Sequence, residues 1–187
     1  MRSLFIVDPQ NGFMDTGSLP VVGAQARMDA LAVYIKSLPF DYYNKIYVSL
    51  DWHPANHCSF KANGGIWPEH CVAYTVGALV TEPLMSELLP WMKADKVVFI
   101  TKGMEKDTEE YSALDNSKTA TFLKEELSDI DQLDVCGVVG TVCVQNTIKS
   151  LAEKAIDARK IKILPEYIAQ FSDEDEQKFL RWFKDHF

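Results

Sequence analysis

Short apolar runs that alternate with helical patterns constrain the fold of this chain more than any other feature. The runs cover residues 4–8, 45–51, 96–102 and 160–164, and a further run begins at Leu133. Short continuous runs of this kind are typical of strands buried in a parallel sheet. Their alternation with helices predicts a three-layer α/β/α fold with an open, mostly parallel sheet of five or six strands, of Rossmann type.

Apolar residues at helical spacing lie between these runs. We expect helices over residues 28–38, 83–92, 117–127 and 142–158, and a last helix that opens at Ser172. Ser172 with Asp175 resembles a capping box, and Phe122 and Leu127 are expected to face the core. No repeat or linker divides the sequence, so residues 1–187 are expected to form a single domain.

The composition limits the class of partner. The net charge is −8 and there is no cluster of basic residues, which argues against a nucleic acid or an anionic membrane as partner. The N-terminus does not resemble a signal peptide, and the four cysteines show no CxxC spacing. We therefore expect a cytoplasmic protein with reduced thiols that acts on a small molecule, and homo-oligomerisation is left open.

Four reactive side chains fall where predicted strands end. Asp8, Asp51 and Lys102 each close a run, and Cys143 follows the strand that begins at Leu133. Because the carboxyl ends of parallel strands meet at one edge of a sheet, we expect these four side chains to converge. Cys143 would lie in the first turn of a helix, where free N–H groups and the helix dipole favour a thiolate. Taken alone, it is better explained as a small core residue.

Convergence of these side chains would build a nucleophile with its base. If Asp8 reaches Cys143, the carboxylate can take the thiol proton and later pass it to a leaving group. Lys102 beside them would stabilise both negative charges and orient Asp8. An amide substrate suits this set, since attack by the thiolate gives an oxyanion that N–H groups around residues 139–143 can hold. The alternative for Asp8 and Lys102 is a buried structural ion pair.

The candidate metal ligands lie at the end of the run over residues 45–51 and in the long segment over residues 52–80 that follows it. Asp51 and His53 are two residues apart, so their side chains point to the same side of extended backbone. His70 would complete a site of three ligands with open positions, as in catalytic zinc or iron sites. His57 is a candidate additional ligand. We expect one divalent ion, zinc in the first place, with iron or manganese as alternatives.

Aromatic residues also lie in the loops that follow the strands. Phe13, Trp67 and Tyr111 can form a slot for a flat ring, or they can pack beneath the long loops. The sequence alone does not decide between the two. His186, close to the C-terminus, is expected to be a surface residue.

Five motifs extend over nearly the whole chain. They read VDPQNGFMDTGSL, DWHPANHCSF, WPEHC, TKG and GVVGTVCV. Their order and spacing resemble the nicotinamidase or pyrazinamidase family of isochorismatase-like cysteine hydrolases. The resemblance implies a catalytic triad of Asp8, Lys102 and Cys143, and metal ligands Asp51, His53 and His70.

The resemblance also implies how the substrate is held. It implies a cis peptide bond at Val138–Val139 and an oxyanion hole made of the N–H groups of Val139 and Cys143. Phe13 and Trp67 match the aromatic residues that sandwich the ring in the family. The complete set of candidate substrate contacts is Phe13, Leu19, Trp67, Tyr111 and Val139. Two departures bear on the substrate more than on the reaction class: Val139-Gly140-Thr141 replaces the usual Ala-Thr-Asp, and Gly12 replaces a frequent aspartate.

The function that the resemblance implies is that of a metal-containing cysteine amidohydrolase. Such an enzyme converts nicotinamide to nicotinate and ammonia in NAD salvage through a thioester, with pyrazinamide as a further substrate. One alternative is a related cysteine hydrolase that acts on another small amide. Another is a catalytically inactive member of the fold that binds a metal or a ligand.

Overall fold

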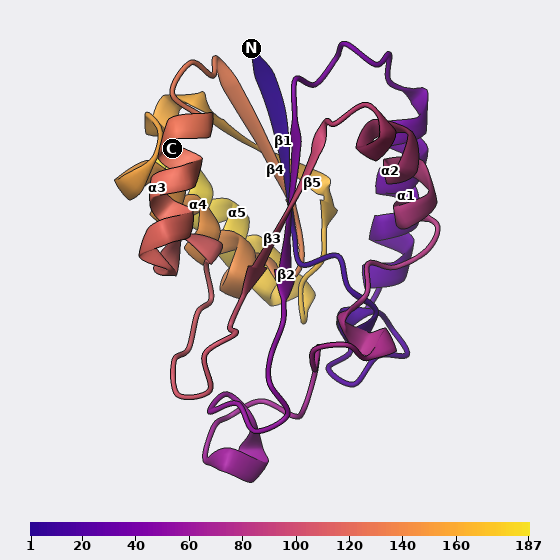
Figure 1. Cartoon of the computed structure of the whole chain (residues 1–187), viewed down its shortest axis with the longest axis vertical. Helices are drawn as coiled ribbons and strands as arrows, with labels where there is room; N and C mark the ends of the chain where they lie inside the picture. The colour runs from indigo at the N-terminus through magenta and orange to yellow at the C-terminus, as the bar shows by residue number, and fades with distance from the viewer.

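The apolar runs form one parallel sheet in the computed structural model, which describes all residues from Met1 to Phe187. The strands are β1 (Arg2–Val7), β2 (Ile46–Asp51), β3 (Val97–Lys102), β4 (Gln132–Gly137) and β5 (Ile161–Ile168). They lie in the order β3-β2-β1-β4-β5, and every neighbouring pair is parallel (Figure 1). The expected five or six strands are therefore five, and the sheet is wholly parallel.

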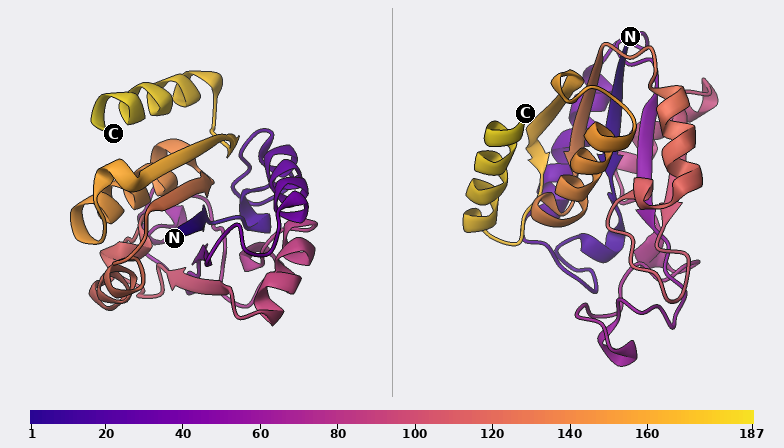
Figure 2. Two further views of the ribbon diagram at one scale, coloured as in Figure 1. Left: turned by 90° about the horizontal axis from the view of Figure 1, so that it is seen from above. Right: turned by 90° about the vertical axis from the view of Figure 1, so that its left-hand side faces the viewer.

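Helices cover both faces of this sheet. One face carries α1 (Ala24–Ser37) and α2 (Leu84–Lys93), and the other carries α3 (Ser117–Glu126), α4 (Gln145–Lys154) and α5 (Asp173–His186) (Figures 1 and 2). This arrangement confirms the predicted three-layer α/β/α class. None of these helices has the length and apolar character needed to cross a bilayer.

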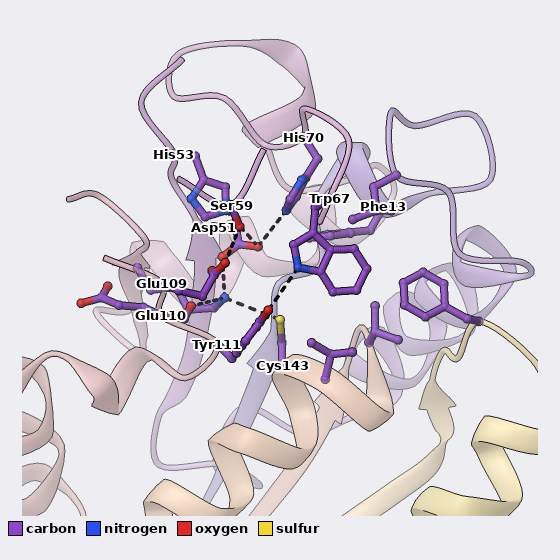
Figure 3. Close-up of a pocket in the computed structure, with 15 residues that line it drawn as sticks. Phe13, Asp51, His53, Ser59, Trp67, His70, Glu109, Glu110, Tyr111 and Cys143 are labelled. Atoms are coloured by element: carbon purple, nitrogen blue, oxygen red, sulfur yellow. Dashed lines mark hydrogen bonds and ion pairs between the residues drawn. The ribbon is translucent and has the colours of Figure 1, made fainter. Parts of the chain in front are cut away.

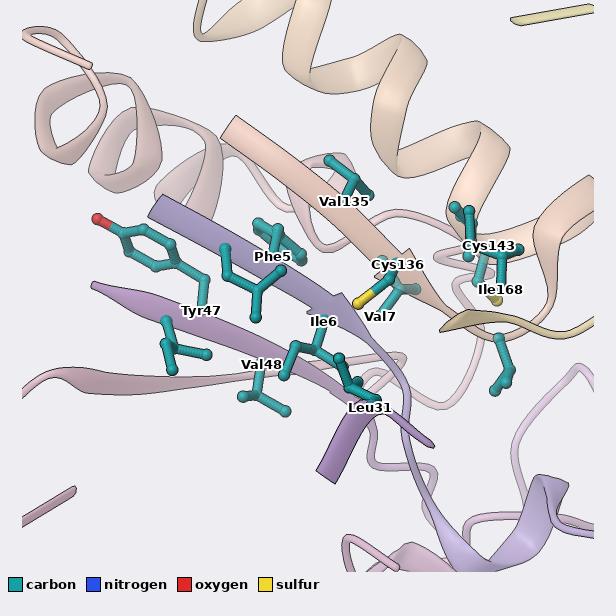
Figure 4. Close-up of a cluster of buried hydrophobic side chains, with 14 of the residues drawn as sticks. Phe5, Ile6, Val7, Leu31, Tyr47, Val48, Val135, Cys136, Cys143 and Ile168 are labelled. Carbon is teal, nitrogen blue, oxygen red and sulfur yellow. The ribbon is translucent and has the colours of Figure 1, made fainter. Parts of the chain in front are cut away.

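The central strands are apolar because helices bury them from both sides. Every residue of β2 is buried, and so is all of β1 except its first residue. Phe5 and Tyr47 stack on one face with ring centroids 6.1 Å apart, while Ile6 and Val48 are neighbours in the same two strands (Figure 4). Removing these side chains from water supplies the main driving force for assembly of the layers.

The strand order places the functional segments. From β1 the chain moves outward to β2 and β3, then returns to the other side of β1 as β4 and continues to β5. The carboxyl ends of β1 and β4 are therefore neighbours at the point where the winding reverses, which is where open α/β sheets bind ligands. Asp8 follows β1 there, and the turn that carries Cys143 follows β4.

Two expectations about helices need correction. Phe122 is 40% exposed, whereas Leu127 is buried as expected. Leu123 is the one buried residue within α3, and adjacent positions on a helix lie about 100° apart, so Phe122 cannot share its face. The helix expected over residues 142–158 begins instead as a wide turn, Gly140–Val144, which continues into α4.

The last strand and the last cap also differ in detail. The strand β5 extends past Leu164 to Ile168 and contains Pro165, which an edge strand tolerates because one side of its backbone needs no partner. Ser172 caps α5 by accepting the N–H of Asp175 at 3.2 Å, and its hydroxyl donates to the carboxylate of Asp175 at 2.8 Å. The reciprocal bond of a full capping box is replaced by this side-chain pair.

A buried carboxylate ties the strands together at the amino end of the sheet. Asp134 in β4 is fully buried and accepts bonds from the Arg2 guanidinium at 2.8 Å and the Tyr43 hydroxyl at 2.7 Å. The amide of Gln132 donates to its second oxygen at 2.7 Å. Asp134 thus joins β1, β4 and the segment before β2.

We predict that Asp134→Ala lowers the free energy of unfolding by about 3 kcal/mol, because three buried or half-buried donors lose their acceptor. Urea unfolding followed by circular dichroism measures the change. Asp131→Ala is the matched control, since Asp131 pairs with the N-terminal amine at the exposed surface and should contribute little. Equal losses in the two variants would contradict this role of Asp134.

Candidate active site

Lys102 contacts the other three strand-end side chains and so joins all four into one cluster. It is the last residue of β3 and lies beside Asp51 in the sheet register, so both side chains point to the same face. Its ammonium contacts Asp51 Oδ1, Asp8 Oδ2 at 3.0 Å, Cys143 Sγ at 3.6 Å and the Glu110 carbonyl at 3.3 Å. Burial alone would lower the pKa of Lys102, but the two carboxylates and the thiol hold it well above its ordinary value. The ammonium therefore stays charged.

Asp8 has one oxygen held and one oxygen free to take a proton. Its Oδ1 accepts the hydroxyl of Ser49 at 2.7 Å, and its buried Oδ2 accepts no hydrogen bond of good geometry. Oxygen atoms of Asp8 and Asp51 and the sulfur of Cys143 lie within 4.8 Å of one another. Burial raises the pKa of Asp8, and the ammonium of Lys102 only partly opposes this. Asp8 is therefore a better proton acceptor than an exposed carboxylate.

The thiol of Cys143 is protonated in this environment. Cys143 is 6% exposed, and burial raises its pKa well above the ordinary value although Lys102 opposes this. Burial therefore opposes the thiolate that the helix N-terminus is expected to favour. The nucleophile needs a base beside it, and Asp8 is placed to serve.

The turn before Cys143 leaves one backbone donor free. The N–H groups of Gly140, Thr141 and Val142 donate to Ala169, Gln170 and Val139. The N–H of Val139 donates to no acceptor in the protein. The Val138–Val139 peptide bond is cis, as the family resemblance implied.

Asp51, His53 and His70 bring three potential metal-ligand atoms close together. Nε2 of His53 and Nε2 of His70 lie 3.6 and 3.7 Å from Asp51 Oδ2, and one donor atom of each residue lies within 4.8 Å of the others (Figure 3). Both Nδ1 atoms face backbone carbonyls, of Gly103 at 3.0 Å and of Pro68 at 2.8 Å, so each Nδ1 carries the hydrogen. The Nε2 lone pairs are then free to bind a metal ion together with the carboxylate, and the bonds at Nδ1 fix the orientation of the two rings.

The charge of Asp51 suits the same role. Burial opposes its ionisation, yet the Lys102 ammonium holds the pKa of Asp51 well below its usual range. A carboxylate oxygen and two imidazole nitrogens are a ligand set that zinc and other divalent ions prefer. These three residues therefore fit a divalent metal ion.

His57 does not join this cluster. Its Nε2 donates to the carbonyl of Thr108 at 3.0 Å and its Nδ1 accepts the N–H of Ser59 at 3.2 Å, so both ring nitrogens are in use. The ring packs against that of His53 with centroids 4.2 Å apart. His186 is exposed, as expected.

A single pocket is lined both by Cys143 and by the three potential metal ligands Asp51, His53 and His70. The residues named above as substrate contacts, namely Phe13, Leu19, Trp67, Tyr111 and Val139, all line it together with Cys143 (Figure 3). The indole of Trp67 donates to the hydroxyl of Tyr111 at 3.2 Å and stacks with Phe171 at 6.1 Å. The aromatic residues thus form pocket walls and not merely packing beneath the loops.

Several supporting residues lie outside the sequence-based set. The buried amide of Gln10 donates to the carbonyl of Asp51 at 2.7 Å and accepts its N–H at 2.8 Å. The carboxylate of Glu110 accepts the N–H of Gly103 at 2.7 Å, next to Lys102. Phe171 follows β5, in a segment where sequence showed no motif. Of these residues, only Gln10 lies within one of the five motifs, and its place in that motif is the only sequence feature that could have indicated its role.

Comparison with known proteins connects this geometry to a family. No protein-family model matches the sequence. The nicotinamidase of Escherichia coli (strain K12) is 32% identical over 170 residues, which cover 79% of this chain and 74% of that protein. The nicotinamidase of Acinetobacter baylyi is 31% identical over 181 residues, covering 84% of this chain and 74% of that protein.

Solved structures agree with the sequence relatives. Pyrazinamidase of Pyrococcus horikoshii in complex with zinc is similar at a TM-score of 0.81 and 30% identity, covering 98% of this chain and 94% of that one. The resemblance of sequence and structure thus covers nearly the whole fold, and the chain belongs to the nicotinamidase/pyrazinamidase family.

Proposed function

We propose that the chain hydrolyses nicotinamide to nicotinate and ammonia, with Cys143 as nucleophile, Asp8 as base and acid, and Lys102 as orienter. Pyrazinamide, a carboxamide on a similar flat ring, is a second expected substrate. The observation that carries the proposal is the single ammonium of Lys102, which contacts Asp8, Cys143 and the metal-type ligand Asp51 at the floor of an aromatic pocket. Nucleophile and ring-binding walls thus open onto the same space.

Acylation follows from the positions of these groups. Oδ2 of Asp8 takes the proton from the thiol as Sγ of Cys143 bonds to the amide carbon. The carbonyl oxygen becomes an oxyanion, and the free N–H of Val139, with that of Cys143, is proposed to hold it. Asp8 then protonates the nitrogen, the C–N bond breaks, ammonia leaves, and a thioester remains on Cys143.

Deacylation uses the same groups in reverse order. Asp8 removes a proton from water while the water oxygen bonds to the thioester carbon. The C–S bond then breaks and releases the carboxylic acid, and the sulfur recovers its proton. Throughout, Lys102 keeps a positive charge beside whichever of Asp8 and Cys143 is anionic, so no step leaves an uncompensated buried anion.

Asp51, His53 and His70 are proposed to hold one divalent ion, with zinc as the expected species and iron or manganese as alternatives. When bound, such an ion supplies a Lewis acid at the wall of the pocket. Asp51 connects this site to the catalytic groups, because its other oxygen contacts Lys102.

The first prediction concerns the nucleophile. The purified protein should release ammonia from nicotinamide, and Cys143→Ala should lower kcat by at least about 10³-fold, because no other thiol lines the pocket. A coupled ammonia assay measures this. Cys58→Ala, which changes a cysteine outside the pocket, is the matched control and should retain kcat. Retained activity in Cys143→Ala would contradict the proposal.

The second prediction concerns pH. Activity needs Asp8 ionised, so kcat/KM should fall as the pH drops through an apparent pKa above the ordinary carboxyl value, since burial raises the pKa of Asp8. Ser49→Ala removes a hydrogen bond that favours the charged form, so its acid limb should move to higher pH. The measurement is the pH profile of kcat/KM for both proteins. If the acid limb of Ser49→Ala stayed in place or moved to lower pH, Asp8 would not be the base.

The third prediction concerns the metal. Elemental analysis should find about one divalent ion per chain, and chelation or His70→Gln should remove both the ion and the activity. His57→Gln is the matched variant, because both nitrogens of His57 already have protein partners. It should keep its metal content. Equal metal loss in both histidine variants would make His57 a ligand after all.

A further inference from the structure

The turn that carries the nucleophile rests against a buried glutamine. Gln170 lies two residues after the end of β5 and is 7% exposed. Its Oε1 accepts the N–H of Thr141 at 3.0 Å, two residues before Cys143. The same amide therefore touches the segment that is expected to hold the oxyanion.

Gly140 makes this contact sterically allowed. A Cβ atom added at Gly140 would lie 1.6 Å from Nε2 and 2.3 Å from Cδ of Gln170, so any larger residue must displace the amide. Nε2 of Gln170 is itself buried and has no hydrogen-bond partner. An unpaired buried donor carries a free-energy cost, so filling space does not explain a glutamine here. The bond from Oε1 to Thr141 does.

Backbone bonds extend this contact on both sides of Gly140. The N–H of Gly140 donates to the carbonyl of Ala169 at 3.0 Å, and the N–H of Ala169 donates to the carbonyl of Gly137 at 3.1 Å. With the bond to Gln170, the N–H groups of both residues that follow Val139 are occupied. The N–H of Val139 remains the free donor.

We propose that Gln170 is a positioning residue for the oxyanion turn, and that Gly140 is the residue that admits it. This rests on the proposed function, because it needs attack by Cys143 on a carbonyl carbon. By fixing Thr141, Gln170 fixes the direction of the peptide groups between β4 and Cys143. No side chain within the turn caps it. The contact from Gln170, in the segment after β5, takes the place of such a cap in a turn with the unusual sequence Val139-Gly140-Thr141.

Side-chain variants of Gln170 separate this role from simple packing. Gln170→Met keeps the length and loses the acceptor, whereas Gln170→Glu keeps an acceptor oxygen but adds charge at a buried position. We expect kcat for nicotinamide to rank Gln above Glu above Met, with a loss of about 10- to 100-fold in Gln170→Met. KM should stay within about threefold, because Gln170 does not line the substrate pocket. Equal kcat in all three proteins would overturn the proposal.

An aldehyde probe reports on the oxyanion position directly. Asp8 takes the proton of the Cys143 thiol as the sulfur adds to the carbonyl carbon of pyridine-3-carbaldehyde. The C=O π electrons move to oxygen, and Asp8 returns the proton to that oxygen, which gives a hemithioacetal. Its inhibition constant should weaken in Gln170→Met by about the factor lost in kcat, while nicotinate binding should not change. If the binding of the aldehyde and the binding of nicotinate weakened by the same factor, the substitution would have damaged the whole pocket, and the positioning role would be wrong.

Gly140→Ala provides a second route that does not depend on how Gln170→Met folds. Its Cβ should expel the amide of Gln170 and reproduce the loss in kcat. In Gly140→Ala combined with Gln170→Met, the two losses should not multiply, because both remove the same contact. Multiplying losses would overturn the coupling. Absence of ammonia release in the unmodified protein would refute the proposed function instead, so the two failures are distinguishable.

Discussion

One buried ammonium holds this site together. Lys102 contacts two buried carboxylates and the thiol, and without it Asp8 and Asp51 would place two like charges within a few ångströms of each other at buried positions. The two carboxylates respond differently: the pKa of Asp8 is raised, and that of Asp51 is well below its usual range. This difference suits the proposed roles, in which Asp8 carries the proton and Asp51 is an anionic metal ligand.

The parallel pairing of the strands places these charged groups next to one another. Parallel pairing of β2 with β3 sets Asp51 beside Lys102, and pairing of β1 with both β2 and β4 brings Asp8 between them and Cys143. Each functional side chain leaves the sheet at its carboxyl edge, where the strand order reverses and the helices separate. The buried apolar strands make this edge rigid, which is what catalytic positioning requires.

The sequence predicted the groups whose placement follows from strand ends. Asp8, Asp51 and Lys102 close short apolar runs, so knowledge of a parallel sheet was enough to bring them together. Other contacts depend on side chains meeting across the fold. The bonds of Gln10 to Asp51 and of His57 to Thr108, and the approach of Gln170 to Gly140, join segments far apart in sequence, and no local pattern encodes them. Phe122 was misplaced because apolar character alone does not give the buried side of a helix.

The pH dependence of Cys143 alkylation by iodoacetamide in the folded protein tests the role of Lys102 most directly. Since Lys102 lowers the pKa of the thiol, Lys102→Met should move the alkylation profile to higher pH and slow the reaction at neutral pH. Circular dichroism would confirm that the variant is folded. An alkylation profile identical to that of the unmodified protein would contradict the account, because it would show that the ammonium does not stabilise the nucleophile.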